Sequence, residues 1–310
     1  MYIHVLEIIG GLVLLFGGGE VLVRGSVGIA RSFGMPIIVI GLTIVAYGTS
    51  APELVVSMQA AMKGSPDIAL GNVIGSNISN ILLVLGVSSL IFPIACKTNK
   101  RDTLVMIGVT ALLIAMSFDG ELGRIDGLIL VSAIIAYTIV VFKTTRNPEE
   151  SVEDEILHIK MPVWKGLLYI FIGVALLIIG SDLLVEGGIT IARSIGVSEA
   201  VIGLTIVAVG SSAPELITSV VAAFRRHSDI AVGNIIGSNI VNIMGILGTT
   251  SAISPIVVDE KFLRVDYWVL LGVTILMVVS LKTGKHISRI EGGLFFAGYI
   301  AYTVFQFYGT

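Results

Sequence analysis

The sequence predicts an all-α polytopic membrane protein, and three observations carry that prediction. Of its 310 residues, 55% are hydrophobic and only 13% are charged, a composition that a soluble domain of this length does not tolerate. Ten apolar segments are long enough to cross a bilayer. A polar motif occurs in the first half of the chain and returns 162 residues later in the second half.

The ten segments are each predicted to be a membrane-spanning helix, because a helix needs about 20 apolar residues to cross the hydrocarbon core. They are 5–23, 36–62, 68–92, 103–119, 125–142, 163–185, 198–224, 230–254, 266–281 and 288–308. The first segment has no basic stretch before it and no cleavage site after it, so it is predicted to be a retained helix and not a signal peptide.

The loops predict the orientation, because Lys and Arg gather on the cytoplasmic side of a membrane protein. Most of the 19 basic residues fall in the loops that follow odd-numbered segments, so both termini are predicted to lie outside. The acidic loop 144–162 is predicted to be a solvated cytoplasmic linker between two domains, 1–143 and 163–310. No tract of Lys and Arg indicates nucleic-acid binding.

The two halves repeat each other. Residues 39–54 align with 201–216, with differences only at Tyr47 against Val209 and Thr49 against Ser211, and the similarity extends over 39–86 and 201–248. Each half has five predicted spans, an odd number, so the second half must enter the membrane in the opposite orientation. The sequence therefore predicts two inverted five-helix repeats, an arrangement that commonly holds a substrate site near the bilayer midplane.

The centre of each motif combines a helix breaker with an acid. Pro52 and Pro214 have no amide hydrogen, so the carbonyl four residues earlier loses its helical partner. Free carbonyls at membrane depth need a cation, water or protein to satisfy them. Glu53 and Glu215 follow the breaks directly, and an ionisable residue within a span indicates function.

Further oxygen-bearing side chains recur around the two glutamates. Hydroxyls and amides lie on the predicted faces of the same and the following helices: Ser50, Ser57, Asn72, Ser76 and Asn80 in the first half, and Ser212, Ser219, Asn234, Ser238 and Asn242 in the second. These hard ligands, without His or Cys, favour Ca²⁺ or Na⁺ over Mg²⁺ and the transition metals. One Ca²⁺ or two Na⁺ would neutralise the two glutamates, and this competition predicts antiport.

The duplicated Gly-Thr/Ser-Ser-Ala-Pro-Glu-Leu and Gly-Asn-Val/Ile-Ile-Gly-Ser-Asn motifs resemble the two repeats of the sodium/calcium exchanger family, over the whole chain. The resemblance implies that Glu53 and Glu215 bind Ca²⁺ and Na⁺ alternately. It also implies exchange of several Na⁺ for each Ca²⁺ by a monomer in the cell membrane, with the first and sixth helices sliding to switch access, and no cofactor. The implied remaining ligands are the carbonyls of Ala46, Thr49, Ala208 and Ser211, the hydroxyls of Ser50, Ser76, Ser212 and Ser238, and Asn80.

The chain departs from some relatives at Asn242, where potassium-dependent members carry Asp, so a potassium requirement is not predicted. Three alternatives to Na⁺/Ca²⁺ exchange remain. A Ca²⁺/H⁺ antiporter could use the same scaffold, and inverted repeats with free carbonyls could also serve an ion channel. An intramembrane hydrolase would need a nucleophile or metal motif such as His-Glu-x-x-His, which the sequence lacks, so the protein is not predicted to be an enzyme.

Overall fold

The structure is a computed structural model that describes residues 2–95, 100–144, 161–196, 206, 208–283 and 286–308. Within these residues the chain is helical almost throughout, and the only two strands, β1 (Glu121–Leu122) and β2 (Ile256–Val257), pair antiparallel. The predicted linker 144–162 lies almost wholly outside the described residues, as do residues 201–205 and 207 of the second motif.

The helical elements recur along the chain at the spacing of the sequence repeat. The first half contains α1 (Tyr2–Phe33), α2 (Ile37–Ile40), the π-helical turn η1 (Gly41–Val45), α3 (Ala46–Thr49), α4 (Ala51–Met62), α5 (Pro66–Ser79), the π-helical turn η2 (Asn80–Leu85), α6 (Gly86–Ile91), α7 (Lys100–Met116), the 3-10 turn η3 (Ser117–Asp119) and α8 (Arg124–Thr144). The second half contains α9 (Val163–Ser194), α11 (Ala208–Ser211), α12 (Ala213–Phe224), α13 (Ser228–Ile240), the π-helical turn η6 (Val241–Leu247), α14 (Gly248–Ile253), the π-helical turn η7 (Phe262–Asp266), α15 (Tyr267–Thr283) and α16 (Arg289–Tyr308). The bounds of α4 and α12, and those of α6 and α14, differ by the repeat spacing of 162.

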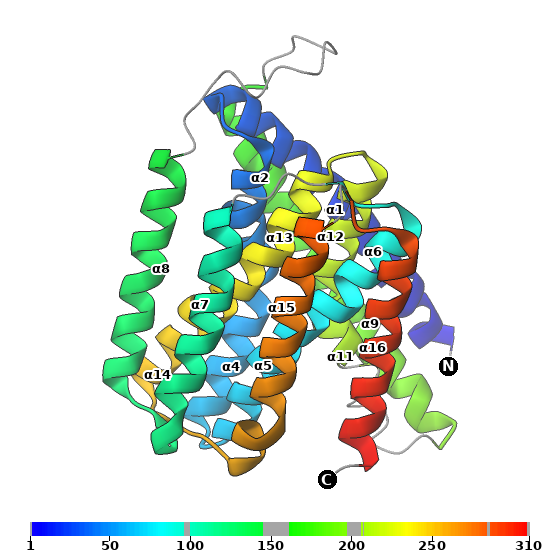
Figure 1. The fold of residues 1–310 in the computed structure, drawn as a ribbon. Coiled ribbons are helices and arrows are strands. Elements are labelled where there is room, and N and C mark those ends of the chain that lie inside the picture. Colours follow the sequence, from blue (N-terminus) through cyan, green and yellow to red (C-terminus); the bar gives the residue numbers. More distant parts are fainter. Residues whose placement is uncertain are drawn as a thin grey trace.

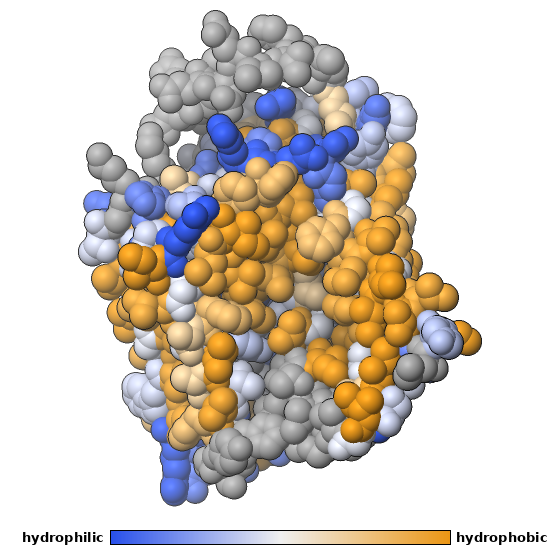
Figure 2. Space-filling view, turned by 90° about the vertical axis from the view of Figure 1, so that its right-hand side faces the viewer, coloured by the Kyte–Doolittle hydropathy of each residue, from blue (hydrophilic) through white to orange (hydrophobic). Residues whose placement is uncertain are grey.

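Seven of the described helical segments are long and apolar enough to cross a membrane, or eight if the bent pair 37–49 and 51–62 is one span. The ten predicted spans stay a prediction. Of the seventh, 198–224, only 206 and 208–224 are described, and α12 accounts for 12 of these residues. In the tenth, α16, polar groups such as Gln306 dilute the apolar character. Figure 2 shows the apolar belt of one face, with hydrophilic side chains gathered toward its upper and lower ends.

The helices separate into an inner and an outer set. Of the most apolar window in the segments 66–91 and 228–253, 78% and 94% are buried, whereas the corresponding shares for α1 and α9 are only 28% and 22%. Figure 1 shows α4, α5 and α13 in the middle of the bundle, with α8 at one edge and α16 toward the other. The third predicted span of each half therefore forms the core, and the second spans, which carry the acidic motifs, pack against it.

The two long outer helices, α1 and α9, pack closely against each other along a row of glycines. On α1 the glycines recur every seven residues, which is about two helical turns. The paired positions are Gly11 with Gly180, Gly18 with Gly173, and Gly25 with Gly166. A Cβ added to Gly18 would lie 2.9 Å from the carbonyl oxygen of Gly173. The missing side chains let the two backbones approach, as small residues commonly do between membrane helices.

The glycine row can be tested with two neighbouring substitutions in α1. Gly18→Ala is expected to lower the thermal unfolding temperature in detergent, because its Cβ meets the backbone of α9 and overpacking costs about 1–3 kcal/mol. Gly17→Ala is the control, since a Cβ there has nothing within 4 Å and Ala favours the helix. Equal unfolding temperatures for both variants would contradict the close packing.

The outer helix α1 is also fastened to α12 by an ion pair. Glu20 accepts hydrogen bonds from Arg24, four residues later, and from both Nε and Nη2 of Arg225 at 2.9 and 2.6 Å. Arg24 is near Glu20 in the sequence, whereas Arg225 is 205 residues away and comes close only through the fold. Asp182 and Glu186, the corresponding positions of α9, are exposed and form no ion pair among the described residues.

Candidate functional site

The predicted break in the first motif is present. The helix from 37 to 49 and the helix from 51 to 62 meet at a 45° bend. Ser50 lies between them with φ −85° and ψ 6°, outside the helical region, and Pro52 stands in the first turn of α4. Because Pro52 cannot donate to the carbonyl of Gly48, the chain turns at this point with Glu53 just beyond it.

The second motif has the same local geometry. Ser212 has φ −89° and ψ 6°, and α12 begins directly after it with Pro214 in its first turn and Glu215 following. The preceding α11 (Ala208–Ser211) ends at the break, as α3 does in the first motif. Each glutamate therefore stands at the start of a helix directly after an opened turn.

The fold brings the two motifs together, although 162 residues separate them in the sequence. Ser50 Oγ donates a hydrogen bond to Glu215 Oε1 at 3.3 Å, from the break of the first motif to the acid of the second. Thr49 Oγ1 donates to Asn234 Oδ1 at 3.1 Å. These contacts place the break of the first motif against the acid and the asparagine of the second.

Both glutamates are buried and incompletely satisfied. Glu53 is 2% exposed and Glu215 is 1% exposed. Five buried oxygens of the predicted ligand set have no hydrogen-bond partner within the described protein; these are Oε2 of Glu53 and Glu215, Oδ1 of Asn80 and Asn242, and Oγ of Ser212. Buried acceptors without donors are costly in a protein interior unless a cation or water satisfies them.

Two other buried acids show the contrast. Asp102 accepts hydrogen bonds from the Tyr137 hydroxyl at 3.2 Å and from Arg101 at 2.8 Å. Asp266 accepts from the Tyr302 hydroxyl at 2.9 Å and from Gln306. These aspartates fasten neighbouring helices to each other and need no ion. The glutamates of the duplicated motifs have no such basic or phenolic partner among the described residues.

Two asparagines donate hydrogen bonds to the backbone carbonyls of the glutamates. Asn72 Nδ2 donates to the carbonyl of Glu53 at 3.2 Å and to Ser57 Oγ at 2.8 Å. Asn234 Nδ2 makes the equivalent bonds to the carbonyl of Glu215 at 3.5 Å and to Ser219 Oγ at 3.2 Å. The sequence placed these polar residues beside the acids, and in the structure they hold the acidic helix starts against α5 and α13.

The remaining predicted ligands differ in their burial and in their hydrogen bonds. Ser76 and Ser238 are buried on α5 and α13, and Ser238 Oγ donates to Asn234 Oδ1 at 3.4 Å. The carbonyl of Ala46 accepts the amide of Ser50 at 3.0 Å, so it still has a helical partner. Ser211 is half-buried at the end of α11, and of Ala208 only the helical backbone is described.

Sequence reasoning missed Asn77 and Asn239, which are buried beside the predicted amide ligands. Asn242 Nδ2 donates to Asn77 Oδ1 at 3.0 Å, and Asn80 Nδ2 donates to Asn239 Oδ1 at 3.2 Å. Their recurrence at the repeat spacing was an available signal. The π-helical turns η2 and η6, which widen the helix at Asn80 and Asn242, could not be read from the sequence and are frequent at functional sites.

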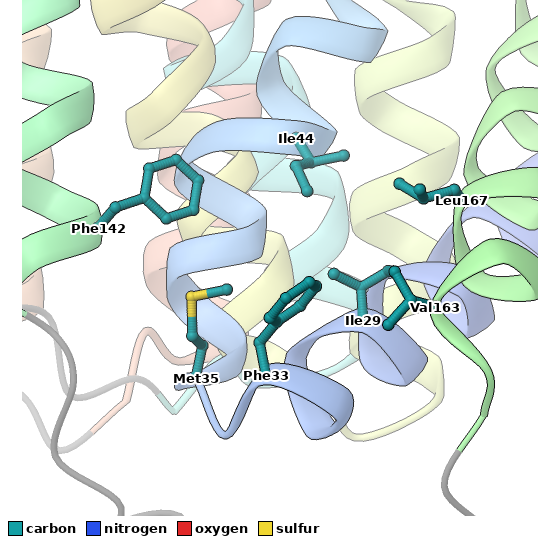
Figure 3. Close-up of a pocket in the computed structure, with 7 residues that line it drawn as sticks. All are labelled: Ile29, Phe33, Met35, Ile44, Phe142, Val163 and Leu167. Carbon is teal, nitrogen blue, oxygen red and sulfur yellow. The ribbon is translucent and has the colours of Figure 1, made fainter.

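The centre contains only two carboxylates. Among the described residues no three His, Cys, Asp or Glu side chains come together, so a cation bound here would also need hydroxyl, amide or carbonyl oxygens. A separate pocket of about 420 Å³ lies between the ends of α1, α8 and α9 and the segment around η1, but its lining is apolar (Figure 3). None of the predicted ligands lines that pocket, so the polar centre on the breaks remains the candidate site.

Comparison with known proteins shows the family to which the chain belongs. The family model described as "Sodium/calcium exchanger protein" matches residues 3–143 and 165–308. The chain belongs to the sodium/calcium exchanger family. It is accordingly a multi-pass integral membrane protein of the prokaryotic type, with the ion-transport and antiport character of that family.

Individual members are similar over nearly the whole chain. The sodium/calcium exchanger MaX1 of Methanosarcina acetivorans is 32% identical over 99% of each chain. The inner membrane protein YrbG of Escherichia coli is 33% identical over 96% of this chain and 94% of that protein. The solved structure of the sodium/calcium exchanger from Methanococcus jannaschii is 35% identical, with a TM-score of 0.85 over 98% of this chain and 99% of that one.

Proposed function

We propose that this protein is a secondary active antiporter that exchanges Na⁺ for Ca²⁺ across the cell membrane by alternating access. The observation that carries the proposal is the pair of buried glutamates, Glu53 and Glu215, in a polar centre where several buried acceptor oxygens have no donor among the described residues. Family membership and the names of MaX1 and of the solved Methanococcus jannaschii exchanger support this choice of ions.

The ions would compete for the same oxygens. The proposed ligand set is the one that the sequence and the family resemblance predict: Glu53, Glu215, Ser50, Ser76, Asn80, Ser212, Ser238 and Asn242, with the carbonyls of Ala46, Thr49, Ala208 and Ser211. Carboxylate, hydroxyl, amide and carbonyl oxygens suit both Ca²⁺ and Na⁺. One Ca²⁺ or two Na⁺ cancels the charge of two ionised glutamates, so binding of one kind excludes the other.

The proposed transport cycle uses the internal repeat. We take the ten predicted spans as two inverted repeats, 1–143 and 163–310, with both termini outside and the site between the halves. An empty site with two ionised glutamates is costly in a low-dielectric interior, so the empty protein is reluctant to change its access. The protein would therefore exchange one kind of ion for the other without a net leak of either. One monomer would contain the complete set of ligands.

Sodium coupling is tested by Ca²⁺ uptake into vesicles that contain the purified protein. We expect an outward Na⁺ gradient to drive Ca²⁺ uptake when the pH is equal on both sides, because Na⁺ leaving the vesicle frees the site for Ca²⁺. Vesicles without protein are the control. Uptake that follows only a pH gradient would indicate Ca²⁺/H⁺ exchange, and Ca²⁺ movement without a counter-ion would indicate a channel.

The paired carboxylates are tested by removing one charge at a time. Glu53→Gln or Glu215→Gln is expected to weaken Ca²⁺ binding by at least about 100-fold and to abolish exchange, because unpairing a buried charge costs about 3–5 kcal/mol. The matched control is Glu186→Gln, the same chemical change at an exposed acid of α9. A glutamate variant that folds and keeps its flux would exclude the paired site.

The potassium question is tested at Asn242, the position that carries Asp in potassium-dependent relatives. Asn242→Asp makes the site charge minus three, so bound Ca²⁺ leaves one negative charge in a buried environment. We therefore expect the variant to require a further monovalent cation, and its Ca²⁺ flux to rise when K⁺ is added, whereas the flux of the unchanged protein does not respond. A variant indifferent to K⁺ would show that the charge at 242 does not set the dependence.

A further inference from the structure

The four amides between the two halves form a crossed set of hydrogen bonds that the proposed ligand set does not explain. Asn77 and Asn239 are 0% and 1% exposed, on α5 and α13. Asn77 Oδ1 accepts a hydrogen bond from Asn242 of the other half at 3.0 Å. Asn239 Oδ1 accepts one from Asn80 of the other half at 3.2 Å. Asn77 Nδ2 also donates to the backbone carbonyl of Asn239 at 3.4 Å, which fixes the orientation of the Asn77 amide.

These bonds decide which end of each ligand amide faces the polar centre. A side-chain amide has an NH₂ donor on one side and an acceptor oxygen on the other. Because Nδ2 of Asn80 and Nδ2 of Asn242 are held by an oxygen of the opposite half, their Oδ1 atoms point elsewhere. Both Oδ1 atoms are buried without a donor in the described protein. A reversed Asn80 amide would bring its oxygen against Asn239 Oδ1, two acceptors without a hydrogen between them.

We propose that Asn77 and Asn239 are positioning residues, each holding the amide from the opposite half so that its Oδ1 faces the transported cation. This inference rests on the proposed ion site. A cation is attracted by the amide oxygen and repelled by the NH₂ group, so the orientation decides whether Asn80 and Asn242 serve as ligands. Neither Asn77 nor Asn239 needs to touch the ion.

The crossed arrangement also makes the ligands of one half depend on the other half. Asn80, on η2, is oriented by Asn239 of α13, and Asn242, on η6, by Asn77 of α5. The two halves must therefore be in contact at this level for the amide oxygens to be presented. A residue that only filled space would show no such specific crosswise dependence.

The test is a set of double-mutant cycles, read by titration of Ca²⁺ to the purified protein and by Ca²⁺ flux in vesicles. Asn77→Ala and Asn239→Ala are each expected to raise the Kd for Ca²⁺ about tenfold, the loss of one oriented ligand, with little change in maximal flux. In the Asn242→Ala background, Asn77→Ala is expected to add less than about twofold, because the amide that it orients is gone. In the Asn80→Ala background, Asn77→Ala is expected to keep its full effect, and Asn239→Ala shows the reverse pattern.

Several results would overturn the inference. An unchanged Kd in both single variants, or independent effects in all four pairs, would leave Asn77 and Asn239 as packing residues. A lower unfolding temperature with unchanged Kd would do the same. If an Ala variant fails to fold, Asn77→Ser and Asn239→Ser, which keep a hydroxyl acceptor, must show the same crossed pattern at a smaller effect. If the unchanged protein binds no Ca²⁺, the proposed function fails first, and that outcome is distinct from binding without the crossed pattern.

Discussion

The structure depends on the burial of two carboxylates at the centre of a membrane protein. Glu53 and Glu215 are almost inaccessible, yet neither has a basic partner among the described residues. A partly satisfied polar centre is less stable than an apolar core, so stability alone does not explain it. In the proposed function, the opened turns at Ser50 and Ser212 and the surrounding amides form an environment in which a cation completes the missing contacts.

The division between inner and outer helices follows from this constraint. The inner helices α5 and α13 carry the hydroxyls and amides on well-buried faces, where their orientation is set by contacts between the halves. The outer helices α1 and α9 are much less buried than the inner ones and contact each other through glycines. A row of glycines has few interlocking side chains. The glycine row joins α1 to α9, so it suits a pair of outer helices that shift together over the polar centre, as the family resemblance implies.

Sequence reasoning reached the acids and the breaks because their signals are local. A proline directly before a glutamate in an apolar segment predicts a helix break beside a buried acid. The same pair recurs at 214–215, so a chance occurrence is not a sufficient explanation. The pairing of the amides was not accessible in the same way. Asn77 and Asn80 are chemically identical and lie within one turn. Only contact with the other half makes Asn80 a donor to the Asn239 side chain and Asn77 an acceptor from Asn242. The partner of Glu20 was missed for the same reason, since Arg225 is 205 residues away.

The crossed contacts also give a physical reason for a duplicated motif. Two independent copies could each hold a glutamate, but each would leave its amide free to turn. Here the hydroxyl of Ser50 reaches Glu215, and Thr49 reaches Asn234, so the first motif completes the polar surroundings of the second. The amides do the same in both directions. A site shared in this way is complete only when the halves are in register. In the proposed cycle, a change in their relative arrangement would alter the oxygens offered to the ion, and a small displacement would in this way couple ion binding to access.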